Sequence, residues 1–225
     1  MPRIEEVSKV VLTVSHAAGE QNPLSGFSVF HGSEELLITT AAQNPPPKKG
    51  ACIRIGTRMG GPVMVLFPTD HLNMMTYGAY DKNEFNVSNP HNIYEPNGSV
   101  IGTITKLQKS VSTSEAPRYA AYLPDCSYML YPIELGKLGV KMPVFNEADE
   151  QIACITRPLK DKKELNRYTI HLFDLHYTML LTAFITYIDA MEFVDKGAAL
   201  PSISFAKSAK ERYSYEFEKS AEMLL

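Results

Sequence analysis

Residues 177–188 read Tyr-Thr-Met-Leu-Leu-Thr-Ala-Phe-Ile-Thr-Tyr-Ile, and this run decides the fold. It contains no charged residue, and Asp174 and Asp189 flank it. The run is longer than most strands and falls short of the roughly twenty apolar residues with which a helix crosses a bilayer. A helix that is apolar on all sides belongs inside a protein. We therefore predict a buried helix here, with Asp174 capping its first turn.

The chain before this helix has the pattern of an all-β protein. Between residues 7 and 172, short apolar or alternating runs are separated by Gly, Pro, Asn and Asp, which is typical of a sandwich or a barrel. Glu95-Pro96-Asn97-Gly98 and residues 146–150 predict reversals of the chain, and Pro45-Pro46-Pro47 predicts a surface loop. The predicted strands, about twelve in all, are residues 7–14, 27–30, 36–40, 51–55, 63–67, 74–80, 99–107, 118–123, 128–133, 141–145, 151–156 and 168–172.

The composition describes a globular protein without disulfides. The chain has 225 residues, of which 44% are hydrophobic, so it can bury a sizeable core, and this composition excludes disorder. Its 22 basic and 25 acidic residues give a net charge of -3, which offers no overall field to hold a nucleic acid. Cys52, Cys126 and Cys154 are too far apart for a disulfide framework or a paired zinc motif, so we expect reduced thiols.

The last residues predict a second helix of a different kind. Gly197 can end the apolar helix, and beyond Pro201 aromatic and small residues recur at every fourth position while most charges fall elsewhere. This amphipathic pattern divides the chain into a body, residues 1–197, and a helical extension, residues 198–225. The apolar stripe includes Phe205, Tyr213 and Phe217, and we predict that it docks on the body, on a partner protein or on a second copy in a homo-oligomer.

About twelve strands followed by one wholly apolar helix imply that the strands enclose the helix, as in a closed antiparallel barrel. The sequence therefore predicts a β-rich (α+β) fold: a closed antiparallel β-barrel around a central, buried C-terminal helix, with the amphipathic helix added at the end. We expect one barrel domain, since the body contains no linker or internal repeat.

Three segments carry a family resemblance. Phe27-Ser28-Val29-Phe30 with Leu36-Leu37-Ile38 forms an opening hairpin, and Met142-Pro143-Val144-Phe145-Asn146 with Gln151-Ile152-Ala153-Cys154-Ile155-Thr156-Arg157 forms a later one. Tyr168-Thr169-Ile170 then leads to an apolar run, residues 180–188, that ends at Asp189. In this order the segments resemble the tubby C-terminal-like superfamily, which includes the tubby domain, the phospholipid scramblases and the LURP-one-related proteins. The resemblance implies a non-enzymatic binding or interaction module for anionic phospholipid headgroups or a protein partner.

One basic cluster is a candidate binding surface. Lys48 and Lys49 follow the three prolines, and Arg54 and Arg58 lie on the next predicted strand, where residues four apart share one face. The cluster is either a patch that binds anions, as the tubby domain does with phosphoinositides, or an ordinary solvated surface. These four residues are proposed from their charge alone.

Catalytic and metal-binding patterns are weak. The sequence contains no nucleophile elbow, no phosphate-binding glycine loop and no zinc protease motif. Cys126 lies in a predicted turn, and His171, Asp174 and His176 are close in sequence but share no face of a strand or helix. We therefore expect no catalytic residue, metal or cofactor, and we expect Asp189 to bond a tyrosine or the backbone. The alternatives are a small hydrolase that uses Cys126 or the His171/His176 region, and a sequestering or regulatory protein.

The expected location is the cytoplasm, with a peripheral position at a membrane if the basic cluster binds lipids. The apolar run at residues 10–14 is too brief for a signal peptide, and no run is long enough for a transmembrane span.

Overall fold

The computed structural model describes residues 10–16, 26–43, 51–70, 85–109, 118–134, 140–157 and 167–193. Three sequence predictions fall outside these ranges: the proline loop at residues 45–47, the strand at residues 74–80 and the amphipathic helix at residues 198–225.

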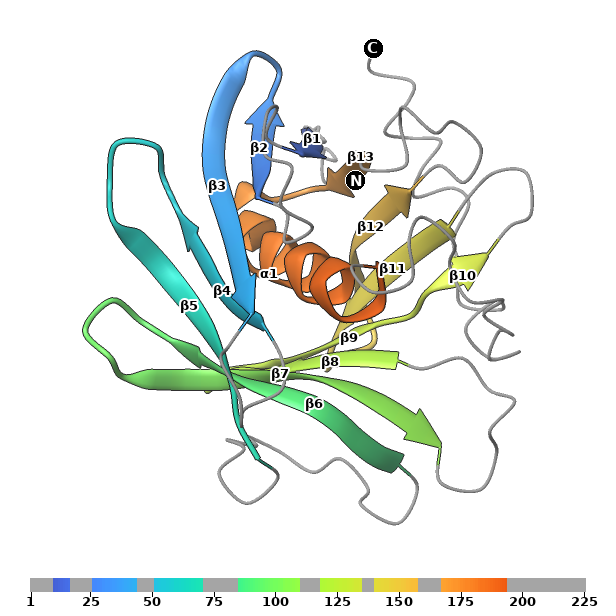
Figure 1. Cartoon of the computed structure of the whole chain (residues 1–225). Helices are drawn as coiled ribbons and strands as arrows, with labels where there is room; N and C mark the ends of the chain where they lie inside the picture. The colour runs from blue at the N-terminus through green and yellow to red at the C-terminus, as the bar shows by residue number, and fades with distance from the viewer. Residues whose placement is uncertain are drawn as a thin grey trace, which may run out of the picture.

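The described strands form one antiparallel sheet that curls around a helix (Figure 1). Strands that follow one another in sequence pair in the sheet, except β9 and β10, which both pair with β11, and β1 joins the two halves of the sheet by pairing with both β2 and β13. The thirteen strands are β1 (Val10–His16), β2 (Phe27–His31), β3 (Glu34–Gln43), β4 (Ala51–Gly56), β5 (Pro62–Pro68), β6 (Phe85–Tyr94), β7 (Val100–Lys109), β8 (Arg118–Tyr122), β9 (Ser127–Leu130), β10 (Ile133–Glu134), β11 (Val140–Asn146), β12 (Gln151–Arg157) and β13 (Arg167–Leu172).

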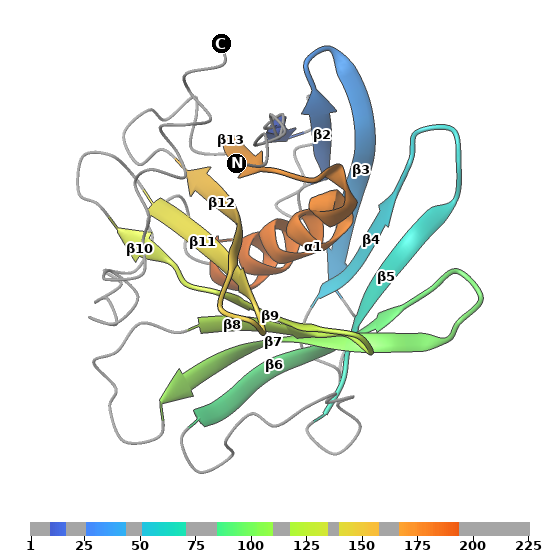
Figure 2. The same cartoon turned by 180° about the vertical axis from the view of Figure 1, so that it is seen from behind.

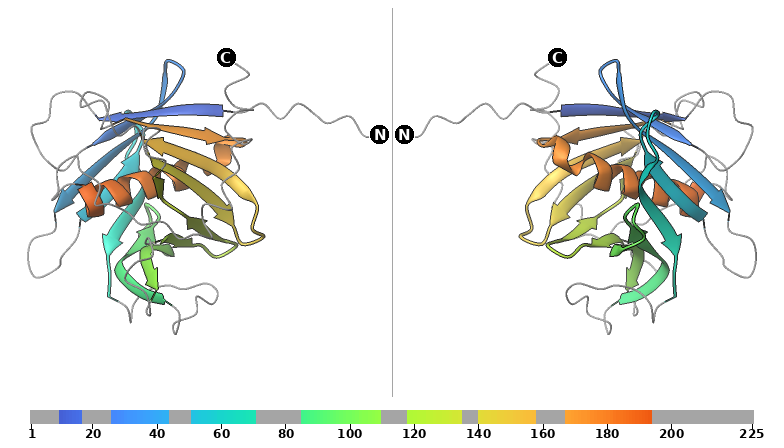
Figure 3. Two further views of the ribbon diagram at one scale, coloured as in Figure 1. Left: turned by 90° about the vertical axis from the view of Figure 1, so that its right-hand side faces the viewer. Right: turned by 90° about the vertical axis from the view of Figure 1, so that its left-hand side faces the viewer.

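The helix inside the sheet is the apolar run, as predicted. It comprises η2, a 3-10 turn (Leu175–Tyr177), the α-helix α1 (Thr178–Ile188) and η3, a π-helical turn (Asp189–Phe193). Asp174 caps η2, since its carboxylate accepts a hydrogen bond from the His176 backbone N–H at 2.8 Å. Every residue of α1 except Met179 is buried. Figures 2 and 3 show the strands on all sides of α1.

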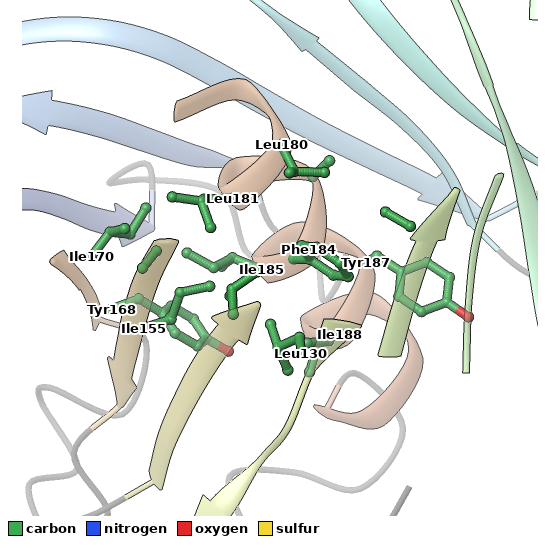
Figure 4. Packing of buried hydrophobic residues seen from close by; sticks show 14 of the residues in the cluster. Leu130, Ile155, Tyr168, Ile170, Leu180, Leu181, Phe184, Ile185, Tyr187 and Ile188 are labelled. Carbon is green, nitrogen blue, oxygen red and sulfur yellow. The ribbon is translucent and has the colours of Figure 1, made fainter. Parts of the chain in front are cut away.

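The core consists of α1 and the inward faces of the strands. Leu181 and Ile185 face Ile170 and Ile155 from β13 and β12, and Phe184 points to the side of Tyr187 (Figure 4). Two of the three threonines of α1 are compatible with this apolar setting, because Thr182 and Thr186 donate their hydroxyls to backbone carbonyls one turn earlier, at 2.7 and 2.9 Å.

The two ends of the sheet meet over a short length only. Residues 144–146 of β11 pair with residues 128–130 of β9, and residues 140–141 pair with residues 133–134 of β10. The structure therefore confirms an antiparallel sheet with a buried C-terminal helix. The predicted closed barrel is not formed: regular pairing of β11 with β9 and β10 is interrupted at residues 142–143, where the Tyr131 N–H donates to the Pro143 carbonyl at 3.1 Å between the two short ladders.

Both predicted chain reversals are present. At the turn after β6 the Gly98 N–H donates to the Glu95 carbonyl at 2.9 Å, and Gly98 has a φ of 86°. At the turn after β11 the Asp149 N–H donates to the Asn146 carbonyl at 3.0 Å, and Asp149 has a φ of 62°. Gly and Asp adopt this left-handed backbone more readily than most residues, which explains why the chain turns there.

Strand β6 was not predicted from the sequence. Its residues read Phe-Asn-Val-Ser-Asn-Pro-His-Asn-Ile-Tyr, which is the composition of a turn rather than of a strand. The register with β7 shifts between Ser88 and His91, and Asn89, with a φ of 52°, lies inside this bulge. The bulge accommodates Asn89 and Pro90, and the strand continues on both sides of it.

The register places the short turns at one end of the sheet, which we call the turn end. It contains residues 32–33, 57–61, 95–99, 123–126, 147–150 and 173–177. The first residue of α1 lies at this end, since the Tyr177 ring is 6.1 Å from the Tyr128 ring next to the β8–β9 turn. The last residue lies near the opposite end, where Asp189 bonds Tyr168 at the start of β13. Among the described residues, every helix is too short or too polar to reach across a bilayer.

We expect Phe184→Ala to lower the free energy of unfolding by about 3–5 kcal/mol, because it removes a fully buried ring from the middle of α1. Met179→Ala, on the one incompletely buried position of the same helix, should cost clearly less. Urea unfolding followed by circular dichroism measures both. Equal losses at the two positions would contradict the enclosure of α1.

Candidate functional site

Arg54 is the cation of the predicted cluster that the structure places most clearly. It lies on β4 between Ile53 and Ile55, which are fully buried, so its own side chain is on the outer face of the sheet and is exposed. Its cross-strand partners are Thr40 on β3 and Val65 on β5. An exposed guanidinium between an uncharged and an apolar neighbour is available to an anion from solvent.

Cys52 shares this outer face with Arg54. Burial raises the pKa of the Cys52 thiol, and the nearby positive charge of Arg54 lowers it in part. A thiol with a raised pKa is a weaker nucleophile at neutral pH, so Cys52 is a poor candidate for covalent chemistry. Arg54 is thus close enough to Cys52 to act on it electrostatically.

Arg58 does not share a strand face with Arg54, which corrects the sequence prediction. Strand β4 ends at Gly56, and Arg58 lies in the following turn. Its Nε is 2.9 Å from Oε2 of Glu35 at the start of β3, and the exposed fractions of the two side chains are 74% and 15%. The ion pair offsets the positive charge of Arg58, so Arg58 attracts a ligand anion less than Arg54 does.

Lys48 and Lys49 lie outside the described residues, in the segment between β3 and β4. Phe205, Tyr213 and Phe217 also lie outside them. The described part of the predicted cluster is therefore the pair of arginines on the β4–β5 hairpin, one on the outer face of β4 and one in the turn.

Cys126 and His176, both candidates for catalysis, both lie at the turn end. Cys126 is half-buried, and its thiol donates a hydrogen bond to the Ser127 carbonyl at 3.4 Å. The Tyr177 ring contacts Tyr128 at 6.1 Å and His176 at 5.5 Å, so two tyrosines separate the thiol from the imidazole. Burial, then Cys126, and then Tyr177 and Glu147 raise the pKa of Tyr128, which stays protonated at neutral pH.

This arrangement differs from that of a cysteine hydrolase. There the thiol bonds directly to a histidine that accepts its proton, whereas the Cys126 thiol donates to a backbone carbonyl oxygen. His171 is buried on β13, Asp174 caps η2, and His176 is exposed. Within the described ranges, no three His, Cys, Asp or Glu side chains form a group that could hold a metal ion.

Asp189 forms a buried polar pair with Tyr168, as predicted for a carboxylate at the end of the apolar helix. The Tyr168 hydroxyl donates to Oδ1 of Asp189 at 2.8 Å, and both residues are buried. The guanidinium of Arg157, also buried, lies 5.6 Å above the Tyr168 ring. This contact with Arg157 was not predicted from the sequence.

The pair supports the fold rather than a reaction. Burial, and then the Asp189 carboxylate, raise the pKa of Tyr168 well above its usual range, and Arg157 offsets part of that effect. Tyr168 therefore remains a protonated hydrogen-bond donor at neutral pH. The bond ties the end of α1 to β13 from inside the sheet.

We expect Tyr168→Phe to lower the free energy of unfolding at pH 7 by about 1–3 kcal/mol, because it leaves a buried carboxylate oxygen without this donor. Tyr94→Phe, on a half-buried tyrosine of β6, is the matched control and should change the value little. Urea unfolding of both variants tests this, and an equal effect would contradict it.

The same residue predicts a pH dependence. A tyrosine in the unfolded chain titrates near pH 10, and the folded pKa of Tyr168 is higher. The stabilisation is therefore complete below a pH of about 10 and is lost as the pH rises from there towards the folded pKa. Wild type should lose stability more steeply than Tyr168→Phe above pH 10, and identical slopes would contradict the raised pKa.

The described geometry thus offers an exposed cation on the outer face of the sheet and a polar group at the turn end, but no assembled catalytic or metal centre among the described residues. No protein-family model, curated protein or solved structure matches the chain.

Proposed function

We propose that the protein is a non-enzymatic binding module of the tubby C-terminal-like class, which recognises anionic phospholipid headgroups through Arg54 and the neighbouring cations Lys48, Lys49 and Arg58. The observation that carries the proposal is the exposed guanidinium of Arg54 on the outer face of a sheet. Arginine donates several hydrogen bonds in a fixed plane, which suits a phosphate.

The filled interior supports a ligand on the outside. Leu181, Phe184 and Tyr187 are fully buried where the sheet curls around α1. A lipid chain or a substrate could enter there only by displacing the helix, at the cost of most of the core. An external headgroup needs no such rearrangement.

The proposal extends to the fold and the location. The short pairings of β11 with β9 and β10 are where a barrel of the tubby-like type would close. A module of this kind works in the cytoplasm, at the surface of a membrane whose inner leaflet carries anionic lipids.

We expect the purified protein to cosediment with phosphoinositide-containing liposomes in a salt-sensitive manner. The variant with Lys48, Lys49, Arg54 and Arg58 all changed to Glu should lose this binding, because each basic residue near an anionic surface contributes about 1 kcal/mol. Liposomes of neutral lipid are the control. Binding that survives the fourfold change, or no binding to any anionic liposome, contradicts the proposal.

Single substitutions distinguish the contributions of Arg54 and Arg58 to liposome binding. Arg54→Glu should weaken binding more than Arg58→Glu, since Glu35 already offsets the charge of Arg58. Circular dichroism confirms that both variants fold. A larger loss of binding for Arg58→Glu than for Arg54→Glu would show that the lipid contacts the β4–β5 turn rather than the outer face of β4.

We also propose that the C-terminal stripe of Phe205, Tyr213 and Phe217 forms a seam with a second copy of the chain. Changing all three to Ser should halve the mass measured by light scattering, because apolar contacts across the seam are lost. A monomeric mass for the unchanged protein contradicts the seam.

A further inference from the structure

The β6–β7 turn contains the one Asn-Gly pair of the sequence, Asn97-Gly98. Residues 95–99 are all exposed, and the turn lies at the tip of a hairpin that extends away from α1 (Figure 1). Gly98 has a φ of 86°, and a Cβ built on it would meet no described heavy atom within 4 Å beyond those of its chain neighbours. The peptide bond between Asn97 and Gly98 is therefore open to water.

Two hydrogen bonds hold the side-chain amide of Asn97. Its Oδ1 accepts from the Ser99 backbone N–H at 2.7 Å, and its Nδ2 donates to Oε2 of Glu95 at 3.1 Å. A donor on a carbonyl oxygen stabilises the negative charge that develops there when a nucleophile adds to the carbonyl carbon. The Ser99 N–H thus activates Cγ of Asn97 towards attack.

The nucleophile within reach along the chain is the backbone nitrogen of Gly98, because its attack on Cγ closes a small, unstrained imide ring. Glycine favours this closure, since it has no Cβ to obstruct the approach of the side chain. In the closed turn the Gly98 N–H donates to the Glu95 carbonyl at 2.9 Å. This bond opens before the attack, and local opening is frequent in an exposed turn that few contacts hold.

We propose that Asn97 is a site of spontaneous deamidation. A bond forms between the Gly98 nitrogen and Cγ of Asn97, and the bond between Cγ and Nδ2 breaks. The proton of the Gly98 nitrogen passes through water to Nδ2, which leaves as ammonia. Water then opens the resulting succinimide at either carbonyl and leaves aspartate or isoaspartate at position 97. Water is the sole co-reactant, and a carboxylate replaces the amide in both products.

The product weakens the turn in which it forms. In the original turn Nδ2 of Asn97 donates to the Glu95 carboxylate, whereas in the product two carboxylates face each other and repel. Isoaspartate also lengthens the backbone by a CH2 group, which disturbs the bond from the Glu95 N–H to the Ser99 carbonyl at 3.0 Å. The modification therefore loosens the tip of the β6–β7 hairpin.

The β11–β12 turn provides a matched control within the same chain. The side-chain amide of Asn146 makes the same two kinds of bond, since its Oδ1 accepts from the Glu150 N–H at 2.9 Å and its Nδ2 donates to Oε2 of Glu150 at 2.8 Å. The next residue is Glu147 rather than glycine, and its side chain obstructs ring closure. We expect Asn146 to remain an amide under conditions that convert Asn97.

Incubation of the purified full-length protein at neutral pH, followed by peptide mapping with mass spectrometry, tests the proposal. Digestion at acidic pH prevents conversion during the mapping itself. The peptide that contains Asn97 should gain the mass of an NH2-to-OH exchange many-fold faster than the peptide that contains Asn146, and its product should contain isoaspartate as well as aspartate. A persistent amide at Asn97, equal rates at the two asparagines, or a product that is aspartate alone would each overturn the proposal.

Asn97→Asp tests the effect of the modification on the turn. Hydrogen exchange measured by mass spectrometry should show faster exchange of the Gly98 N–H in this variant than in wild type, because the carboxylates at positions 95 and 97 repel. Adding Glu95→Gln should restore much of the protection, since it removes one of the two charges. Circular dichroism checks that both variants fold. Exchange at the wild-type rate in Asn97→Asp would show that the modification leaves the hairpin unchanged.

Discussion

The burial of α1 inside the curled sheet is the constraint on which the rest of the structure depends. The helix is short and apolar on nearly every side, and in water it would expose all of that surface. The sheet in turn has inward faces whose leucines, isoleucines and tyrosines need something to pack against. Neither element is stable alone, so helix and sheet form a single core, and the interior is not available for a ligand.

Inside this apolar core, the polar side chains at the end of the helix have few possible hydrogen-bond partners. Tyr187 donates its hydroxyl to the Asn89 carbonyl at 2.7 Å, and His91 Nδ1 lies 2.9 Å from the same oxygen. The bulge in β6, which breaks the regular ladder, directs this carbonyl towards the helix. On another side Tyr168 bonds Asp189. These bonds fix the rotation of the helix within the sheet, which apolar contacts alone specify poorly.

The sequence predicted the elements of the fold better than their closure or their polar contacts. The apolar helix, the β-rich body and the two reversals at Gly98 and Asp149 follow from local patterns and are present, while Asp174 caps the 3-10 turn η2 before α1 rather than α1 itself. Strand β6 was missed because its composition is that of a turn. Its pairing with β5 on one side and β7 on the other stabilises the strand, and the local sequence does not reveal this pairing. For Asp189 the sequence predicted a tyrosine or backbone partner but could not say which one. Tyr168 is 21 residues away in sequence, and only the packing of the helix against β13 brings the two together.

The basic cluster shows why a binding site is harder to predict than a core. A run of cations in sequence indicates charge, but the charge available to a ligand depends on partners that come from elsewhere in the chain. Glu35, on a different strand, offsets Arg58 and leaves Arg54 as the more available cation. Which surface an anion meets follows from the position of each charge on the sheet, and the register of the strands determines that position.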